Sequence, residues 1–399
     1  MIHHLFTLIW NRKKSNFLMI TEIFFSFIVL FGVLSLAFYY LNNFQKALGY
    51  NYNNVWVMTL RANQEKPNEF KDILRRLKQQ LKSNAQVEGV AFSNSNVPYS
   101  MNQMSGGFFH NHRMVQTDFF QVDNDFAQVL QLNITEGRWF NQQEENSKYT
   151  NIVINQSLRN ELFKDEPVIG KIVAGMGGDE KKPLTKIVGV VDAYKQKGEY
   201  AEDKPSFFEY KYLNNTQDSI GVPFNLALIR VKSGVTSGFE EDLMKQASRI
   251  AQGWTLEIKT MPEMRTSYNK VALIPLIIFS VVCGFLILNV ALGLFGVLWY
   301  NINRRISEIG LRRAIGAASG QVYNQFVGEV LVLATFSILL GILVAAQFPL
   351  LQVFGVQTGV YLAAMGVSVG IIYLLAAGCA AYPSRQAAKI QPAAALHEE

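Results

Sequence analysis

The sequence predicts a membrane protein with four spanning helices and a large α+β domain outside the bilayer. The apolar residues are unevenly spread, although they make up only 49% of the chain. Four stretches reach the roughly 20 apolar residues that cross a bilayer core of about 30 Å. Residues 42–270 contain no such stretch. Much of the net charge of +6 lies beside the apolar stretches, which favours a membrane topology signal over nucleic-acid binding.

The first spanning helix is predicted at 17–41, after a short basic segment at 1–16. A secretory signal peptide begins in a similar way, but its apolar core is about 7–15 residues long and ends at a small-residue cleavage site. The stretch 17–41 is longer and ends in aromatic residues that include Tyr39 and Tyr40. We therefore expect a retained helix with an aromatic pair at the membrane interface.

Residues 42–270 are predicted to fold as an α+β domain, because strand and helix patterns replace the long apolar runs. A strand–helix–strand order occurs twice, once near each end of this region. The six predicted elements are Val55–Leu60, Asn68–Leu81, Val87–Phe92, Leu226–Val231, Phe239–Ile250 and Thr255–Ile258. We expect both units to form one membrane-proximal subdomain, covering about 50–100 and 220–262.

An insertion at about 105–215 is predicted to form a distal subdomain that splits the membrane-proximal one. Its signals are mostly those of strands, with turn residues between them. The predicted strands are Ile152–Ile154, Lys171–Ala174, Lys186–Val191 and Phe207–Tyr210. Short helices are expected at Asp123–Leu130 and Asn155–Phe163, the first of them beginning with the acidic side chains of Asp123 and Asp125.

Three more spanning stretches follow at 271–300, 326–350 and 360–381. The first of these is longer than the hydrocarbon core requires at about 1.5 Å per residue. Tilt in the membrane and a helical stalk continuing into the outer domain both account for the excess. The segment 351–359 carries no charge and is predicted to be a short outer loop.

Basic residues predict which segments face the cytoplasm. They precede the first span, occupy the loop 301–325 and follow the fourth span in 382–399. They are Arg12, Lys13, Lys14, Arg304, Arg305, Arg312, Arg313, Arg385 and Lys389. We therefore expect both termini and the loop 301–325 in the cytoplasm, with the large domain on the outer side.

The segment Asn303–Ala317 reads N-R-R-I-S-E-I-G-L-R-R-A-I-G-A and is the most specific part of the sequence. Ordinary positive charge at the ends of membrane spans explains its four arginines. Its apolar residues, however, fall into two helical registers whose phase changes near Gly310, and Glu308 interrupts the basic residues. A short helix at an angle to the preceding span explains these features, with arginines suited to lipid head groups or a partner's carboxylates. The residues alone leave both readings open.

The segment after the fourth span begins with Tyr382 and Pro383 and continues S-R-Q-A-A-K-I-Q-P-A-A-A-L. Proline shortly after an apolar run predicts the end of the spanning helix. We expect a short basic helix to follow and to end near Pro392.

The run E-I-G-L-R-R-A-I-G-A at 308–317, after two arginines, resembles the cytoplasmic loop of the FtsX-like permease family, which includes the MacB-type exporters. The C-terminal segment resembles the usual ending of this family of type VII ABC permeases, with Gln386 in place of an arginine. The residues that carry the two motifs are Arg304, Arg305, Glu308, Gly310, Leu311, Arg312, Arg313, Ile315, Gly316, Tyr382, Pro383 and Arg385. Shorter matches follow the family's order in the outer domain, at Glu136–Phe140, Ile152–Asn155, Ile169–Lys171 and Ile187–Val191.

This resemblance implies a permease subunit whose outer domain is of the MacB periplasmic-core type. A separate ATP-binding subunit is expected, because the sequence contains no G-x-x-x-x-G-K-[ST] phosphate loop. A second permease chain, identical or different, is also implied, as is a coupling helix at about Ser307–Gly316 that contacts the ATPase. We expect no catalytic residue and no bound cofactor in this chain, with ATP and Mg²⁺ held by the partner.

Three functions remain open on the sequence. The first is a mechanotransmitting ABC permease of the bacterial cytoplasmic (inner) membrane. It would export or extract amphiphilic peptides, lipoproteins, lipids or toxic small molecules, with or without a periplasmic adaptor. The second is an FtsX-like regulator that activates a cell-wall hydrolase. The third is a four-span receptor with no ATPase partner.

Other features receive a structural interpretation. The pair His110 and His112 lacks a cysteine or carboxylate cluster that would complete a metal site, so no metal is expected. Glu22 and Glu329 interrupt apolar spans, and we expect them at the interface or in helix packing. Glycines that would allow close helix approach are Gly284, Gly293, Gly296, Gly328 and Gly341.

Overall fold

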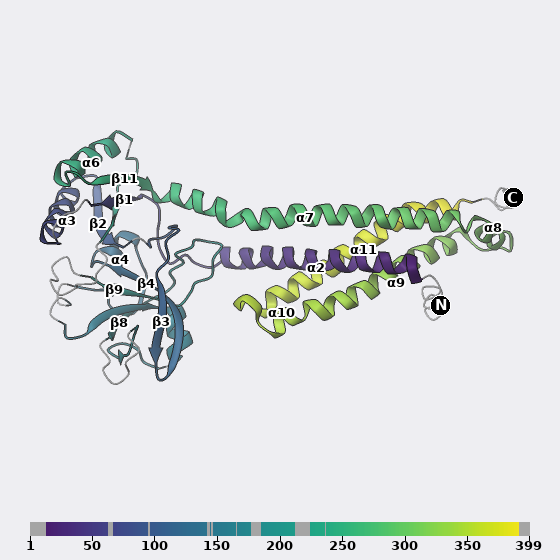
Figure 1. Ribbon diagram of the computed structural model, residues 1–399, viewed down its shortest axis with the longest axis horizontal. Helices are drawn as coiled ribbons and strands as arrows, with labels where there is room; N and C mark the ends of the chain where they lie inside the picture. Colours follow the sequence, from purple (N-terminus) through teal and green to yellow (C-terminus); the bar gives the residue numbers. More distant parts are fainter. Residues whose placement is uncertain are drawn as a thin grey trace. The chain divides into compact units, whose positions relative to one another are not determined.

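The structure, a computed structural model, consists of two compact units (Figure 1). The helical unit holds residues 1–42 and 273–399, and the α+β unit holds residues 43–272. The described residues are 13–62, 67–94, 96–141, 144, 147–164, 166–176, 185–211, 224–235 and 237–390. Two predicted features, the basic residue Arg12 and the helix end near Pro392, lie outside them.

Four helices among the described residues are long and apolar enough to cross a membrane. They span Phe17–Phe44, Met261–Asn303, Ser319–Leu350 and Thr358–Ala388. The prediction of four such helices is therefore confirmed. The elements of the helical unit are α2 Lys13–Phe44, α7 Met261–Asn303, α8 Ile306–Ala314, α9 Ser319–Ala345, α10 Gln347–Leu350, the 3-10 turn η3 Val353–Gly355 and α11 Thr358–Ala388.

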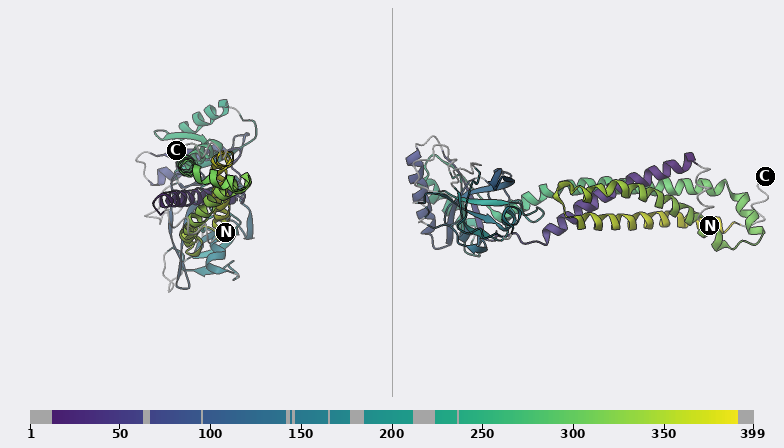
Figure 2. Two further views of the ribbon diagram at one scale, coloured as in Figure 1. Left: turned by 90° about the vertical axis from the view of Figure 1, so that its right-hand side faces the viewer. Right: turned by 90° about the horizontal axis from the view of Figure 1, so that it is seen from below.

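The core of the helical unit is formed by α2, α9 and α11 together with one side of α7 (Figure 2). Helix α2 buries Ile23, Phe27 and Leu30, which follow one another at helical spacing. Gly341 of α9 lets the ring of Phe27 approach the helix, because a Cβ there would lie 2.3 Å from Cδ1 of the ring. This glycine therefore has the packing role that the sequence suggested.

A second close approach joins α2 to α7. A Cβ at Gly293 would lie 2.6 Å from Oε2 of Glu22, so the carboxylate of Glu22 packs against the backbone of α7. By contrast, Gly284, Gly296 and Gly328 have open space where a Cβ would point. Two of the five predicted glycine contacts thus exist within this chain.

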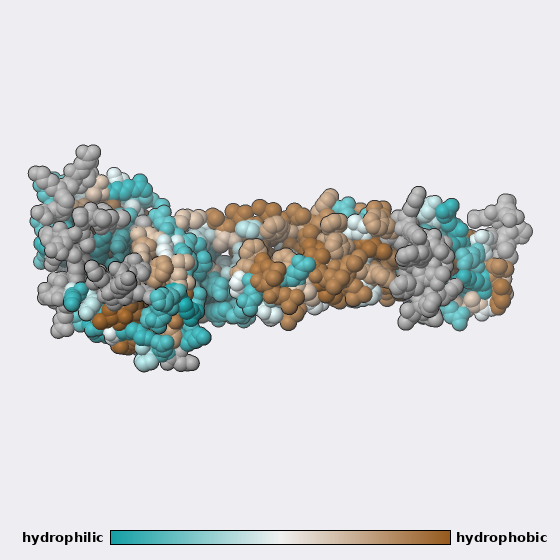
Figure 3. Space-filling model, turned by 60° about the horizontal axis from the view of Figure 1, so that its bottom comes forward, coloured by the Kyte–Doolittle hydropathy of each residue, from teal (hydrophilic) through white to brown (hydrophobic). Residues whose placement is uncertain are grey.

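Most of the part of α7 that belongs to the helical unit is exposed. Its buried residues between 273 and 303 are Cys283, Val290, Leu294, Leu298 and Ile302, which lie along one face. The remaining faces carry large apolar side chains such as Val281, Phe285 and Leu292. Apolar side chains cover much of the outer surface of the helices in the space-filling view (Figure 3). Such a surface is suited to lipid or to another apolar helix.

The α+β unit contains one eleven-stranded sheet among its described residues. The strands are β1 Val55–Arg61, β2 Val87–Ser93, β3 Ser105–His110, β4 Arg113–Val122, β5 Ile134–Gly137, β6 Thr150–Asn155, β7 Ile172–Val173, β8 Thr185–Val191, β9 Ser206–Tyr210, β10 Leu226–Val231 and β11 Thr255–Thr260. The helices are α3 Pro67–Lys82, α4 Phe126–Leu130, α5 Gln156–Leu158, the π-helical turn η2 Arg159–Phe163 and α6 Ser237–Ile250. The strand order is β11-β1-β10-β2-β4-β9-β6-β8-β5, with β3 beside β4 and β7 beside β8.

The strands β11, β1, β10 and β2 come from the two predicted strand–helix–strand units, which interleave. Neighbouring strands in this part of the sheet are antiparallel throughout. Numbered along the chain, their order is 4-1-3-2, the arrangement of a βαββαβ sandwich. Helices α3 and α6 cover one face, where Leu77 and Leu243 pack with Met58 and Ile229 of the strands. The apolar face of each helix, repeated every three to four residues, explains this layer.

The insertion continues the same sheet through a narrow junction. Strands β2 and β4 pair at Ser93 and Val122, and β4 then pairs in parallel with β9. One hydrophobic core extends across this junction, because Val57 of β1 belongs to the same cluster as Val153 of β6 and Phe208 of β9. The two predicted subdomains therefore share both a sheet and a core.

Two predicted helices of the insertion differ from the observed elements. Helix α4 begins at Phe126, since the buried carboxylate of Asp123 accepts hydrogen bonds from the backbone N–H of Phe92 at 2.8 Å and from Lys78 at 2.6 Å. Asp123 therefore fixes β2 and α3 and does not begin a helix. The helix predicted at 155–163 has only one α-helical turn, α5, before it widens into η2.

The histidine pair lies at the turn between β3 and β4. His110 ends β3 with its ring 4.8 Å from that of Phe163, and His112 lies in the turn before β4. The described part of the chain contains no group of three or more histidine, cysteine or acidic residues placed to hold a metal ion.

Candidate functional site

The loop between α7 and α9 contains the short helix α8, which covers most of the predicted coupling segment Ser307–Gly316. Helix α7 ends at Asn303, and a turn at Arg304 and Arg305 precedes α8. The chain therefore changes direction at the two arginines, and the expectation that the helical phase changes near Gly310 is wrong. Gly310 is buried inside α8. Within α8, Ile309 lies on the buried face and Leu311 on the exposed face.

The buried face of α8 rests on the ends of three long helices. Ile309 packs in a cluster with Ile302 of α7, Val322 and Phe326 of α9, and Ala387 of α11. This contact unites segments that lie far apart in the sequence. A displacement of α8 would therefore be felt by all three helices, because close-packed side chains transmit strain.

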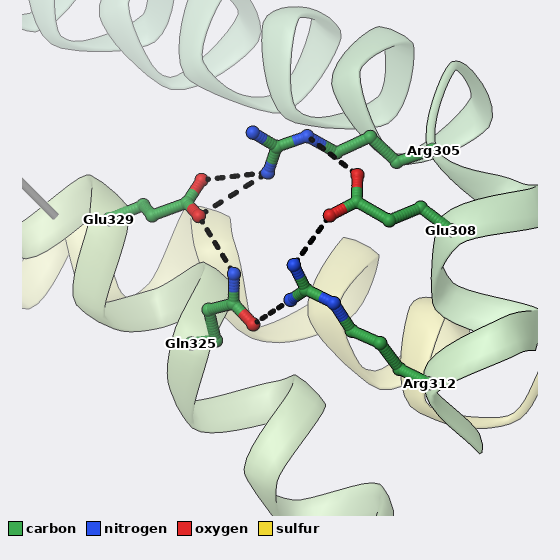
Figure 4. Close-up of polar contacts among 5 residues, drawn as sticks. All are labelled: Arg305, Glu308, Arg312, Gln325 and Glu329. Atoms are coloured by element: carbon green, nitrogen blue, oxygen red, sulfur yellow. Dashed lines mark hydrogen bonds and ion pairs between the residues drawn. The ribbon is translucent and has the colours of Figure 1, made fainter. Parts of the chain in front are cut away.

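Five side chains form a polar network between the turn, α8 and α9 (Figure 4). Arg305, which is only 7% exposed, places Nη1 3.3 Å from both carboxylate oxygens of Glu329 and Nε 3.9 Å from Oε2 of Glu308. Arg312 donates to Glu308 at 2.5 Å and to Gln325 at 2.9 Å. Gln325 in turn donates to Glu329 at 3.2 Å. The network holds α8 in one orientation, since each charge has an opposite partner.

The opposite side of α8 is exposed and partly apolar. Leu311 is 52% exposed and Ile315 is 78% exposed. Together with the exposed residues Ser307 and Ala314 they follow helical spacing, and we name these four residues the outer face of α8. Large apolar side chains exposed on an otherwise polar loop are suited to a protein partner.

The four arginines of the loop have separate roles in the structure. Arg305 and Arg312 belong to the polar network, whereas the exposed Arg304 lies over the ring of Tyr300 at 5.5 Å. Arg313 donates from Nη1 to the carbonyl oxygen of Ala317 at 3.2 Å.

The loop leaves α8 through a glycine. Gly316 has a φ of +103°, a backbone conformation that L side chains rarely adopt. A glycine at this position ends α8 and allows the chain to turn into α9.

The C-terminal motif lies in α11, which continues through Pro383 to Ala388. The prediction that this proline ends the helix is wrong. Pro383 is buried, and the packing of Ala387 in the α8 cluster favours the helical path despite the loss of one backbone hydrogen bond. Tyr382 is exposed and stacks on Phe295 of α7 at 6.1 Å, while Arg385 is exposed.

Comparison with known proteins identifies the family. Residues 17–246, more than half of the chain, match the family described as MacB-like periplasmic core domain. Residues 277–392 match the family described as FtsX-like permease C-terminal. The chain is an ABC transporter permease of the MacB/FtsX type. Permeases of this family work with an ABC ATPase partner.

Relatives of this permease include macrolide exporters and an uncharacterized permease. It is 23% identical over 343 residues to the uncharacterized ABC transporter permease YvrN of Bacillus subtilis (strain 168), covering 80% of this chain and 78% of that protein. It is 24% identical over 276 residues to the macrolide export ATP-binding/permease protein MacB of Bdellovibrio bacteriovorus, covering 66% of this chain and 41% of that protein. The permease thus spans less than half the length of that exporter.

The solved structures similar to part of this permease include a region of an exporter. The periplasmic region of MacB from Actinobacillus actinomycetemcomitans aligns with 57% of this chain and 98% of its own, at 13% identity and a TM-score of 0.39.

Two residues of the polar network were not assigned to the site of this permease from its sequence. Glu329 was expected to have an interfacial or packing role, and Gln325 was not considered. Their spacing of four residues at the start of α9 places them on one helix face, close in sequence to four arginines. A carboxylate in an apolar helix beside such a loop is the sequence signal from which an ion pair could have been predicted.

Proposed function

We propose that this permease transmits the cycle of a separate ATP-binding subunit to its outer domain. The outer face of α8 docks on the ATPase, and α7 carries the resulting displacement toward residues 43–272. Nucleotide and Mg²⁺ bind in the partner and not in this chain. Both termini and α8 face the cytoplasm of a bacterial cell, in its cytoplasmic membrane, and the α+β unit faces outward.

The observation that carries this proposal is the two-sided character of α8. Its exposed side presents Leu311 and Ile315, whereas its buried side is fixed to α7, α9 and α11 by Ile309 and by the polar network. If α8 were loosely attached, a force on it would move α8 alone and would not reach the long helices. Because α8 is packed against α7, α9 and α11, a force on its outer face is transmitted to these helices.

A second permease chain and an extracytoplasmic cargo complete the proposal. The exposed apolar side of α7 is suited to a second α7-like helix, from an identical or a related chain. The proposed cargo is an amphiphilic peptide, a lipoprotein, a lipid or a toxic small molecule; the name of the exporter relative specifies macrolide export. Activation of a cell-wall hydrolase is the alternative output of the same movement.

The test is a charge on the outer face of α8. Leu311→Asp and Ile315→Asp should each reduce co-purification of the ATP-binding subunit at least tenfold, since burying an unpaired carboxylate in an interface is costly. Membrane insertion and yield of the permease should not change. Pull-down from detergent extracts, quantified against the permease, measures the effect.

The matched control is Ser319→Asp, which adds the same charge to an exposed position of the same loop beyond α8. An acidic residue is tolerated there because it lies at the N-terminus of α9. Full binding of the ATPase subunit by both α8 variants would overturn the docking assignment.

A further inference from the structure

The connection between β8 and β9 contacts both places where the chain enters and leaves the α+β unit. We name residues 193–204 the clamp segment. It lies between the last residues of α2 and the first turns of α7, and all the contacts described below are within residues 43–272.

On one side the clamp segment holds the end of α2 through a buried lysine. Lys195 is 1% exposed, and its ammonium group donates to the carbonyl oxygens of Asn43 at 2.5 Å and Lys46 at 3.3 Å. These acceptors are carbonyl groups at the C-terminus of a helix, where a positive charge is favourable. Burial lowers the pKa of Lys195.

Two further contacts bring the clamp segment against the same helix end. Asn43 donates to the carbonyl oxygen of Tyr200 at 3.2 Å, and the rings of Phe44 and Tyr200 stack at 5.7 Å. Gly49 lies directly on the backbone of Ala193, because a Cβ at Gly49 would meet the Ala193 carbonyl oxygen at 1.7 Å. Side chains therefore join the clamp segment to the end of α2, and at Gly49 the two backbones are in direct contact.

On the other side the clamp segment holds the start of α7. Glu199 pairs with Arg265 and accepts a hydrogen bond from Asn269 at 3.1 Å, both on α7. Burial raises the pKa of Glu199, but the bonds from Arg265 and Asn269 outweigh it and hold this pKa below its usual value. The carboxylate is thus charged and bound to one face of the first turns of α7.

The clamp segment is also anchored in the inserted part of the sheet. Tyr194 is buried, with its ring 4.8 Å from Phe120 of β4 and 4.9 Å from Phe208 of β9. Asp203 accepts hydrogen bonds from the backbone N–H of Tyr194 at 3.0 Å and from Asn155 of β6 at 3.1 Å.

We propose that the clamp segment passes the displacement of α2 and α7 into the strands β4, β6, β8 and β9, with Lys195 and Glu199 as its positioning residues. This inference rests on the proposed transmission of force along α7 and names the element that receives it. The start of α7 also packs in the core that both parts of the sheet share, through Met261. The clamp segment adds direct polar contacts to α2 and α7, through Lys195 and Glu199, at the connection between two strands of the inserted part.

The test compares amide hydrogen exchange of the full-length permease and its ATP-binding subunit in nanodiscs, nucleotide-free and trapped with ATP and vanadate. In the unaltered protein, trapping should change exchange in residues 261–272 and in 185–211. In Glu199→Gln and in Gly49→Ala, the change at 261–272 should persist and the change at 185–211 should fall at least twofold. A full response at 185–211 in both variants would overturn the clamp.

Each variant has a matched control. Gly253→Ala places a Cβ at a similar positive φ, +82° against +85° at Gly49, but in open space. Glu166→Gln removes one partner of an exposed ion pair, that with Lys171, away from α2 and α7. Both controls should keep the full response at 261–272 and 185–211, and a loss in either would overturn the inference by showing that the effect is not specific to the clamp segment.

The permease alone separates this inference from the proposed function. Without any ATPase, Glu199→Gln should speed exchange in residues 261–272 and 193–204 together, whereas Glu166→Gln should not. Suppose that Glu199→Gln speeds exchange in both segments, but that trapping does not change exchange at 261–272 in the unaltered complex. The proposed force transmission is then wrong, whereas the contact made by the clamp segment is supported. If Glu199→Gln leaves exchange in both segments unchanged, the clamp itself fails.

Discussion

Asp203 is a carboxyl group whose surroundings resist its ionisation. Burial raises its pKa from 3.8 to about 6, although the backbone N–H of Tyr194, the side chain of Asn155 and the charge of Lys195 oppose this effect. Between these two pH values the unfolded chain releases the proton and the folded chain keeps it. The unfolding free energy therefore falls as pH rises through this window, and the loss is complete above about pH 6.

Replacing this carboxyl group with an amide should remove the loss. Asp203→Asn keeps an acceptor for Tyr194 and Asn155, and it should stabilise the α+β unit at pH 7.5 by about 2–3 kcal/mol, the free energy equivalent of the pKa change. The apparent Tm of the full-length protein, measured from pH 4 to 8, should vary less with pH than in the parent. The exposed neighbour Glu202, changed to Gln, serves as the control. An unchanged pH profile in Asp203→Asn would contradict the prediction.

At individual residues, the sequence did not predict which side chains of α8 are buried and which are exposed. Leu311 and Ile315 were recognised as part of the family's loop motif. Only the structure shows that both are exposed, whereas Ile309, two positions before Leu311, is buried. The arginines of the loop were expected to face lipid head groups or a partner's carboxylates, but the structure gives them separate contacts within the chain. These separate contacts depend on Glu329. Its carboxylate stands out in an apolar stretch of the sequence, but its distance from Arg305 is set by helix packing.

Helix α8 is the element whose orientation depends most on electrostatics. Arg305 is almost fully buried, and Glu329 is its main carboxylate partner. Removing one partner leaves the other charge unpaired at a partly buried site, which costs more than the pair itself contributes. Glu329→Met should therefore release α8 and expose the loop between α7 and α9.

Limited trypsin digestion measures this release, because Arg304, Arg312 and Arg313 are cleavage sites in the loop. Cleavage there should be at least fivefold faster in Glu329→Met than in the parent. The double variant Arg305→Met with Glu329→Met removes both charges and should return toward the parental rate. A double variant as sensitive as Glu329→Met would show that the ion pair does not set the position of α8.

At the level of elements, long periodic segments were predictable and short ones were not. The four apolar helices and the pairs of strands around α3 and α6 follow from hydrophobic runs and periodicity. The predictions at Asp123 and Pro383 were wrong because tertiary contacts override local preference. Asp123 accepts a buried hydrogen bond from Phe92, and the packing of Ala387 favours a helix that continues past Pro383. Tertiary contacts of this kind are absent from any single stretch of sequence.

For the whole molecule, α7 is a single helix of 43 residues that belongs to the α+β unit at its start and to the helical unit for the rest of its length. If it carries force, its continuity matters more than the identity of any one side chain. Inserting Gly-Gly between Ala272 and Leu273 should interrupt the helix at low cost to either unit. Nucleotide-dependent exchange changes at 261–272 should disappear.

Binding of the ATPase subunit should survive this insertion, since α8 is untouched. The control is the same Gly-Gly insertion after Gly234, in the exposed turn between β10 and α6. The transmission model predicts no effect from the control. A normal response in the protein with the interrupted α7 would mean that the signal reaches the outer domain by another route.

The order of the strands has a consequence for biosynthesis. Strand β1 leaves the ribosome soon after α2, yet its two neighbours in the sheet are β10 and β11, which are synthesised at the end of the domain. Until then β1 and β2 have no complete set of partners, and pairings this distant along the chain form slowly. If the α+β unit faces outward, as proposed, the half-translocated domain passes through a stage with unsatisfied strand edges. We expect extracytoplasmic chaperones and quality-control proteases to act on this protein chiefly at that stage, before α7 enters the membrane.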